Sequence, residues 1–297
     1  MNYITNRYKF FAFSALLIII GLGMMVYHGM QGEDILNYDI EFKGGTVLHL
    51  DIGTNFDANK DILPLAKEYL EDNSPVIQIV PDTTEVIITT QVTDSTLRKN
   101  FVDAVKEQFG TNENIILEEN SVSPTISPEI KTQAISAILL GSLLMLIYIW
   151  IRFNDFKFGA SAVLALVHDV LIMLMVYAVF RVPVNNSFIA AMLTIIGYSI
   201  NDTIIVFDRI RENRKSVTNN DEELINLSIN QTITRSINTS ITTLIMVSSL
   251  LIFGTASVRE FAFPLVIGVL SGTYSSIFIA SPIWFEMRKA VRNKKSK

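Results

Sequence analysis

An acidic side chain lies within an apolar stretch of the sequence at Asp202, in the run Gly-Tyr-Ser-Ile-Asn-Asp-Thr that spans 197–203. Asp208 marks the expected membrane edge, and a helix rising 1.5 Å per residue would then place Asp202 roughly 9 Å deep. An ionisable group in hydrocarbon costs at least about 2.5 kcal/mol, so it predicts a partner, a water-filled cavity or a function. Tyr198 and Asn201 fall on the same helix face, and we expect this polar face to look into a helix bundle.

A second polar stripe starts at Arg235 in the next apolar segment, where Asn238 and Thr239 follow at helical spacing. We expect Arg235 and Asp202 to lie at similar depth on neighbouring helices. Arginine keeps its proton, whereas burial favours a neutral Asp202 and a nearby cation favours its carboxylate. We therefore interpret the pair as a proton-coupling switch; the alternative is a salt bridge that only fixes helix packing.

A third polar pair, His168 and Asp169, lies midway through another apolar segment. An imidazole beside a carboxylate could extend a proton path. A structural hydrogen-bonding pair that joins this helix to its neighbours explains the two residues equally well.

Six apolar segments are long enough to cross about 30 Å of hydrocarbon. They run over residues 10–27, 130–151, 158–180, 186–207, 233–253 and 261–285. No small-x-small cleavage site follows the first, so we interpret it as an uncleaved anchor rather than a signal peptide. The predicted organisation is a cytoplasmic N-terminus and first helix at 1–30, an outer domain at 31–128, helices two to six at 129–287 and a basic tail at 288–297.

Lysine and arginine are unevenly distributed between the two sides of these segments. With both termini inside, the cytoplasmic pieces would hold 15 of these residues, whereas the short outer loops hold one each, Arg181 and Arg259. Positive charge collects on the cytoplasmic side of membrane proteins. We therefore expect a multi-pass membrane protein with both termini in the cytoplasm and the domain at 31–128 outside it.

The outer domain shows alternating strand and helix patterns. Strands are predicted at 45–51, 76–80, 85–91 and 114–118, and helices at 59–71 and 96–109. Asp94 and Ser95 are typical helix-capping residues before the second helix. The order β-α-β-β-α-β predicts a ferredoxin-like α+β domain attached to an all-α membrane bundle.

The composition argues against several classes of function. Hydrophobic residues make up 49% of the 297 residues, and residues 31–131 hold 19 acidic against 7 basic side chains. Such an acidic domain does not favour nucleic acid as a partner. Cysteine is absent and His28 and His49 are isolated, so we expect no metal site and no cofactor.

Several glycines have structural interpretations. Gly268 and Gly272 form a G-x-x-x-G pattern that predicts close helix packing. Gly44 and Gly45 predict a tight turn after the first helix, with an anion cradle as the alternative.

Four motifs together resemble the SecF branch of the SecD/SecF family, which belongs with the resistance-nodulation-division (RND) superfamily of proton-driven transporters. They are A-L-V-H-D-V at 165–170, I-G-Y-S-I-N-D-T at 196–203, V-F-D-R-I-R-E-N at 206–213 and S-I-N-Q-T-I-T-R-S-I-N-T-S at 228–240. The resemblance covers essentially the whole chain. It implies an RND-type half with six transmembrane helices, in which Asp202 matches a proton-linked carboxylate and Arg235 an essential arginine.

The same resemblance implies a role in protein export. It points to SecD, the SecYEG channel, a translocating preprotein and YajC as partners, to protons as the coupling ion, and to a further carboxylate supplied by SecD. The family pattern G-x-D-F-x-G-G after the first helix reads Asp39, Ile40, Glu41, Phe42, Lys43, Gly44, Gly45 in this chain. Asp39 thus replaces the family's glycine and Glu41 its aspartate, which affects the expected detail of the membrane-proximal strand.

Three other functions remain open at the level of the sequence. One is an RND-type exporter half for a lipid or small molecule, although such exporters carry about twelve spans in one chain. Another is a passive scaffold that binds emerging polypeptide without ion coupling. An aspartyl protease using Asp169 and Asp202 is disfavoured because neither lies in a G-x-G-D motif, and we expect no enzymatic activity.

Overall fold

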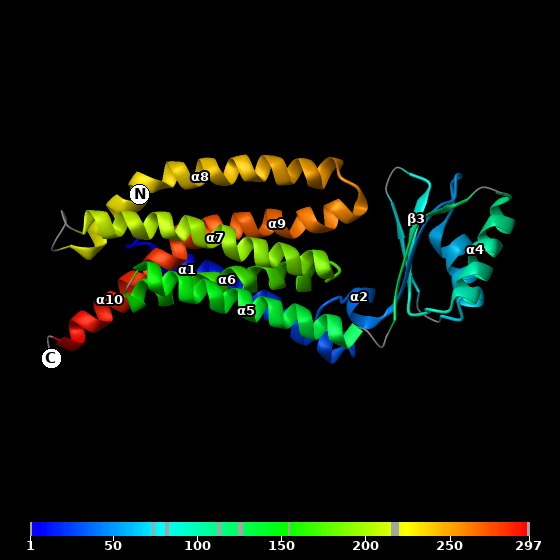
Figure 1. The fold of residues 1–297 in the computed structure, drawn as a ribbon, viewed down its shortest axis with the longest axis horizontal. Coiled ribbons are helices and arrows are strands. Elements are labelled where there is room, and N and C mark those ends of the chain that lie inside the picture. Colours follow the sequence, from blue (N-terminus) through cyan, green and yellow to red (C-terminus); the bar gives the residue numbers. More distant parts are fainter. Residues whose placement is uncertain are drawn as a thin grey trace. The chain divides into compact units, whose positions relative to one another are not determined.

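The chain forms two compact units, shown in Figure 1 as a computed structural model that describes residues 2–295 except 73, 74, 81, 82, 112, 113, 124–126, 154 and 215–219. One unit comprises Met1–Asn37 with Ser136–Lys297, and the other comprises Tyr38–Ile135. Lys215 and Lys297, which the charge argument places in the cytoplasm, lie outside the described residues.

Long helices make up the first unit. They are α1 (Arg7–Met30), α5 (Ser127–Phe153), α6 (Phe156–Phe180), α7 (Asn186–Asn213), α8 (Asp221–Phe253), α9 (Ala256–Ser275) and α10 (Ser281–Lys295), with a π-helical turn η2 (Ser276–Ala280) between the last two. Within the described residues, six helices are long and apolar enough to cross a membrane, the sixth running through α9, η2 and α10. The predicted six-helix membrane class is thus confirmed, although several helices extend beyond the predicted apolar cores.

Side-chain caps explain where several of these helices begin. Asn185 accepts a hydrogen bond from the backbone N–H of Phe188 at the start of α7, and Asn220 accepts from two backbone N–H groups at the start of α8. The first turn of α8 holds Asp221, Glu222 and Glu223, which complement the positive end of the helix dipole.

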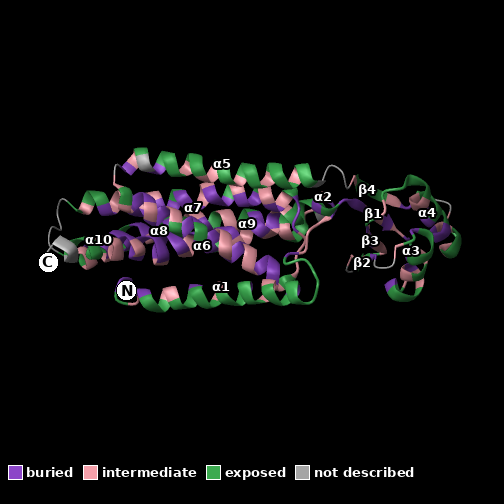
Figure 2. Cartoon of the chain, turned by 90° about the horizontal axis from the view of Figure 1, so that it is seen from below, coloured by how far each residue is buried: buried purple, intermediate pink, exposed green. Residues whose placement is uncertain are grey.

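The bundle is unevenly buried. Figure 2 shows mostly exposed residues along α1 and α5, whereas α6 and α7 carry many buried ones. Gly268 and Gly272 of α9 face α7, where an added Cβ would overlap the side chain of Ile195 and approach Ser199. The predicted close packing at this pair is therefore present. Gly21 of α1 meets Met175 of α6 in the same way, which the sequence analysis did not anticipate.

The second unit is a sheet with helices on one side. Its elements are α2 (Ile40–Lys43), β1 (Gly45–Asp51), the π-helix η1 (Ala58–Ile62), α3 (Leu63–Tyr69), β2 (Val76–Ile79), β3 (Glu85–Thr90), α4 (Ser95–Phe109) and β4 (Ile116–Val122). The strand order is β2-β3-β1-β4 and all pairs are antiparallel. Alternate residues of β1 and β3, including Leu48, Leu50 and Val86, join Phe101 of α4 in a fully buried core.

The β-α-β-β-α-β order is the one predicted, and Asp94 caps α4 as expected, with its side chain accepting from the backbone of Thr96 and Leu97. Assignment to the ferredoxin-like group remains a prediction. The closing strand was predicted to end at Glu118, yet β4 continues to Val122. The sequence did not reveal this continuation because these residues are exposed and mostly polar and show no apolar alternation. The first predicted strand, 45–51, is present as β1, and the segment before it that departs from the family pattern, Ile40–Lys43, forms a short helix that Asp39 caps.

Gly44 and Gly45 follow this helix with φ of 81° and 133°. A Cβ at Gly45 would overlap the carbonyl of Thr90, so glycine is required where the chain turns into β1.

Candidate functional site

Asp202 is one of the most deeply buried carboxylates of the bundle. It lies in the second half of α7, and the residue is 1% exposed. Neither carboxylate oxygen has a hydrogen-bond partner among the described residues. A buried ionised carboxylate without a partner is costly, so this site needs either a proton or a hydrogen-bond donor.

Arg235, the expected partner of Asp202, lies on the neighbouring helix α8 but is exposed. Within the part of the chain that the structure describes, its guanidinium has no ion-pair partner. The two charges interact through space without a hydrogen bond between them. The structure thus places the acid inside the bundle and the cation on its surface.

The other residues of the two predicted stripes divide between the interior and the surface. Asn201 and Asn238 are exposed. Tyr198 donates a hydrogen bond of 3.3 Å from its hydroxyl to Thr243, which joins α7 to α8. Thr239 is half-buried and its hydroxyl donates to the backbone carbonyl of Arg235 at 2.9 Å. The prediction that the whole polar face of α7 looks inward is therefore wrong, because only Asp202 is fully buried.

Asp169 is the centre of a buried hydrogen-bond network. Its residue is 2% exposed, and its carboxylate accepts from Ser271 at 2.7 Å, Ser199 at 2.6 Å and Ser275 at 2.7 Å. Nδ1 of His168 lies 3.1 Å from the same carboxylate. These contacts join α6, α7 and α9, so the carboxylate oxygens are well satisfied where those of Asp202 are not.

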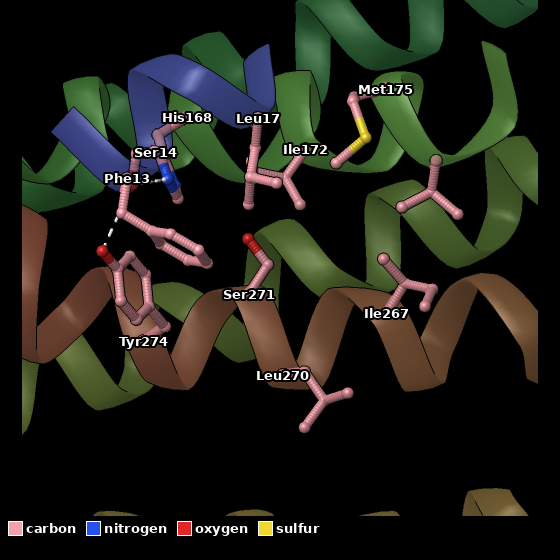
Figure 3. A pocket seen from close by; sticks show the side chains of 11 residues that line it. Phe13, Ser14, Leu17, His168, Ile172, Met175, Ile267, Leu270, Ser271 and Tyr274 are labelled. Atoms are coloured by element: carbon pink, nitrogen blue, oxygen red, sulfur yellow. Dashed lines mark hydrogen bonds between the residues drawn. The ribbon is translucent and has the colours of Figure 1, made fainter. Parts of the chain in front are cut away.

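His168 continues the network toward α1. Its Nε2 lies 3.0 Å from the hydroxyl of Ser14, which donates at 3.4 Å to Tyr274, and Tyr274 donates at 3.0 Å to the carbonyl of Phe10. Figure 3 shows Ser14, His168 and Tyr274 at one end of a pocket of about 320 Å³ between α1, α6 and α9, whose other lining residues are apolar except Ser271. The histidine and aspartate therefore join four helices, as a structural hydrogen-bonding pair would, and the proton path through them stays a prediction.

The segment beside Asp202 is also tied to the π-helical turn. The hydroxyl of Thr203 lies 3.0 Å from that of Ser276, the first residue of η2, and Ser276 donates to the carbonyls of Ser199 and Gly272. A π-turn inside a longer helix is often found at functional sites. The turn of α7 that carries Asp202 is thus held from two sides, by Asp169 and by η2.

Sequence reasoning missed the serines of this network. Ser14, Ser199, Ser271, Ser275 and Ser276 come from three segments that are far apart in the chain. The one available signal was the spacing of Ser271 and Ser275 on one helix face of an apolar segment. No group of three or more histidine or acidic residues that could hold a metal ion occurs among the described residues.

Residues 84–290 match the family model "Protein export membrane protein SecD/SecF, C-terminal". Among curated relatives, a protein translocase subunit SecF from Rhodothermus marinus is 35% identical over 96% of this chain and 92% of its own length. One from Dictyoglomus turgidum is 36% identical over 97% of this chain and 99% of its own length.

Two solved structures are similar along nearly the whole chain. The crystal structure of SecDF from Thermus thermophilus has a TM-score of 0.84 and 33% identity, and covers 97% of this chain. A crystal structure of SecDF in a super-membrane-facing form has a TM-score of 0.69 and 32% identity, and covers 99%. This chain spans only 39% and 40% of those longer chains.

Proposed function

This chain belongs to the SecD/SecF family of protein-export membrane proteins, and from this premise we propose that it is an accessory subunit of the Sec translocon of the SecF type. Its relatives are translocase subunits, so the proposed role is transport rather than catalysis. SecD is the proposed partner, because the similar solved chains are SecDF molecules of which this chain spans less than half.

The proton motive force is the proposed energy source. The membrane potential supplies roughly 2.3 kcal/mol per charge per 100 mV, which can drive a proton onto a buried acid. Asp202 is the observation that carries this proposal, because it is buried and neither of its oxygens has a hydrogen-bond partner among the described residues. Proton binding at Asp202 removes the free-energy cost of a buried charge, and proton loss restores that cost. Each cycle of binding and release can therefore shift the bundle between two packing arrangements.

The exposed polar face of α7 and α8 supports the proposed partnership. Asn201, Arg235 and Asn238 are exposed on helices that are otherwise apolar enough to cross a membrane. Such groups do not face hydrocarbon without a partner. A SecD-type half that contributes a carboxylate opposite Arg235 would cover this face and complete the proton path.

The orientation of the chain is part of the proposal. The family points to a bacterial cytoplasmic membrane. The bias of lysine and arginine favours both termini in the cytoplasm and the β-sheet unit outside. There, the outer unit would meet preprotein leaving the SecYEG channel and hinder its backsliding. YajC is a further proposed partner on resemblance alone.

Reconstitution tests this function. The chain would be placed in vesicles with SecD and SecYEG, and release of preprotein would be followed with and without a proton gradient. We expect gradient-dependent release that is lost in Asp202→Asn and Arg235→Met and kept in the surface control Glu223→Gln. Full gradient-dependent release in both variants would refute proton coupling at this site and leave a passive scaffold. Transport of a lipid or small molecule without any effect on preprotein would instead support the exporter half.

A further inference from the structure

A groove lies between α4 and β4 of the outer unit, beside an edge of the sheet with which no other described strand pairs. In the order β2-β3-β1-β4, strand β4 pairs with β1 and ends the row, and Figure 2 shows both helices, α3 and α4, on one side of these strands. The groove has a volume of about 410 Å³. An open strand edge next to a helix-lined groove is a geometry that can accept an extended peptide.

The groove has an apolar floor. Leu48 of β1 is fully buried and Val102 of α4 is 5% exposed, while Ile116 of β4 is half-buried. Of these, Ile116 is open enough to contact a strand laid along β4. Alternate side chains of that strand would face α4, because successive side chains of a strand point to opposite faces.

The wall of the groove is basic within an acidic unit. Arg98, Lys99 and Lys106 line it from one face of α4. Arg98 is already paired with Glu119 at 2.7 Å, whereas neither lysine has an ion-pair partner among the described residues. Asp103 is the other carboxylate in the lining, so three cations meet two carboxylates in a unit whose residues 38–135 hold 17 acidic and 7 basic side chains.

We propose that this groove binds an extended polypeptide segment bearing acidic side chains, which pairs with the free edge of β4 as a fifth strand. Backbone hydrogen bonds to β4 supply affinity for any sequence, and Lys99 and Lys106 select carboxylates on the side chains that face α4. The proposal rests on the proposed function only in taking polypeptide as the cargo of the protein.

The shape of β4 limits where pairing occurs. The register with β1 is regular from Glu118 to Val122 and skips Leu117, which is 52% exposed. A skipped residue marks a β-bulge, where the ladder is interrupted. The added strand therefore pairs with the Glu118–Val122 half, and its end reaches the part of the groove floored by Ile116.

Peptide binding to the full chain in nanodiscs tests the proposal. The probes are two fluorescein-labelled decapeptides, one alternating threonine with glutamate and one alternating threonine with lysine. We expect the glutamate peptide to bind more tightly, although the net charge of the outer unit alone favours the lysine peptide. Lys99→Glu combined with Lys106→Glu should weaken binding of the glutamate peptide by about tenfold or more. The control Lys60→Glu with Lys67→Glu makes the same charge change outside the groove and should leave the preference for glutamate intact.

Backbone pairing is tested separately with glutamate peptides that are N-methylated at odd or at even positions. Only one of the two sets should lose binding, because alternate N–H groups of an added strand face β4. Preference for the lysine peptide, equal loss in the groove and control variants, or indifference to both methylation patterns would each overturn the proposal. Gradient-dependent preprotein release is a separate measurement, so failure of peptide binding would leave the proposed function standing.

Discussion

Ser199 of α7 donates a hydrogen bond of 2.6 Å to the carboxylate of Asp169 in α6. Ser199 lies one helical turn before Asp202, so this contact fixes the rotation of the helix segment that carries the buried acid. The two aspartates therefore differ in kind. Asp169 is satisfied by donors from its own chain, and Asp202 has none among the described residues.

Replacing Asp169 with asparagine should destabilise the bundle. The amide presents N–H donors to a serine hydroxyl or His168 where an acceptor was, and loses the charge that strengthened each hydrogen bond. We expect a loss of about 2–4 kcal/mol of unfolding free energy, measured by thermal unfolding in detergent. Glu223→Gln on the exposed start of α8 is the matched control. Equal stability of the two variants would show that the network does not brace the helices.

A methyl group at Gly268 should be poorly tolerated. Its Cβ would overlap Ile195, so that Gly268→Ala must push α9 away from α7 at a cost of about 1–3 kcal/mol. Gly197→Ala is the control, because its added Cβ meets no side chain or neighbouring helix among the described residues within 4 Å, and alanine favours the helix. The melting temperature of Gly268→Ala should be lower than that of the parent chain, and that of Gly197→Ala should equal or exceed it. The reverse order of melting temperatures would contradict close packing at Gly268.

Replacing Asn226 with alanine should detach residues 2–6, which precede α1, from helix α8. Oδ1 of Asn226 accepts from the backbone N–H of Tyr3 at 2.8 Å and of Ile4 at 3.3 Å, and both of these residues are buried. Loss of this acceptor leaves two backbone donors unpaired, which costs about 1–3 kcal/mol each where they stay buried. We expect faster amide hydrogen exchange over residues 2–6, with no change in Glu223→Ala. Unchanged protection in Asn226→Ala would mean that packing of Ile4 alone holds the segment.

Acid should loosen the outer unit through Asp51. The hydroxyl of Thr84 donates to its carboxylate at 2.6 Å, and with the backbone N–H of Gly53 this holds the pKa of Asp51 below its ordinary value of 3.8. A lowered folded-state pKa stabilises the fold above the unfolded value, and this contribution is lost as the pH falls through the folded value. Protection of β1 amides, corrected for intrinsic exchange, should fall between about pH 5 and about pH 3.

The control for this pH effect is Asp51→Asn, which cannot ionise. At the higher pH, the β1 amides of this variant should be less protected from hydrogen exchange than those of the parent chain. On acidification, their protection should change less than in the parent chain. An identical acid response in parent and variant would assign the effect to other carboxylates.

The sequence predicted the six helices and the order of the outer elements because long apolar runs and alternating patterns depend on local burial. It also predicted that Asp202 is buried. The position of Arg235 could not be predicted, since helical spacing gives the face of a helix but not which neighbour covers it. The serines around Asp169 escaped prediction because a hydrogen bond between distant segments leaves no periodic signal.

The ends of several strands and helices differed from the predicted ends for a related reason. Strand β4 continues past Glu118 through exposed polar residues, whose pairing with β1 is a property of the backbone. Helix α8 begins at Asp221, well before its apolar core, because Asn220 caps an acidic first turn. Helix α7 begins where it was predicted and continues past Phe207 to Asn213, with Ile210 buried in this last part.

The central claim is that Asp202 takes up and releases the proton that drives export. The most direct test is proton entry into vesicles that hold the chain with SecD and SecYEG, followed with an internal pH-sensitive dye during preprotein translocation. The account predicts translocation-dependent proton entry that disappears in Asp202→Asn and persists in Asp208→Asn, which lies at the end of the same helix. Undiminished proton entry in Asp202→Asn would contradict it.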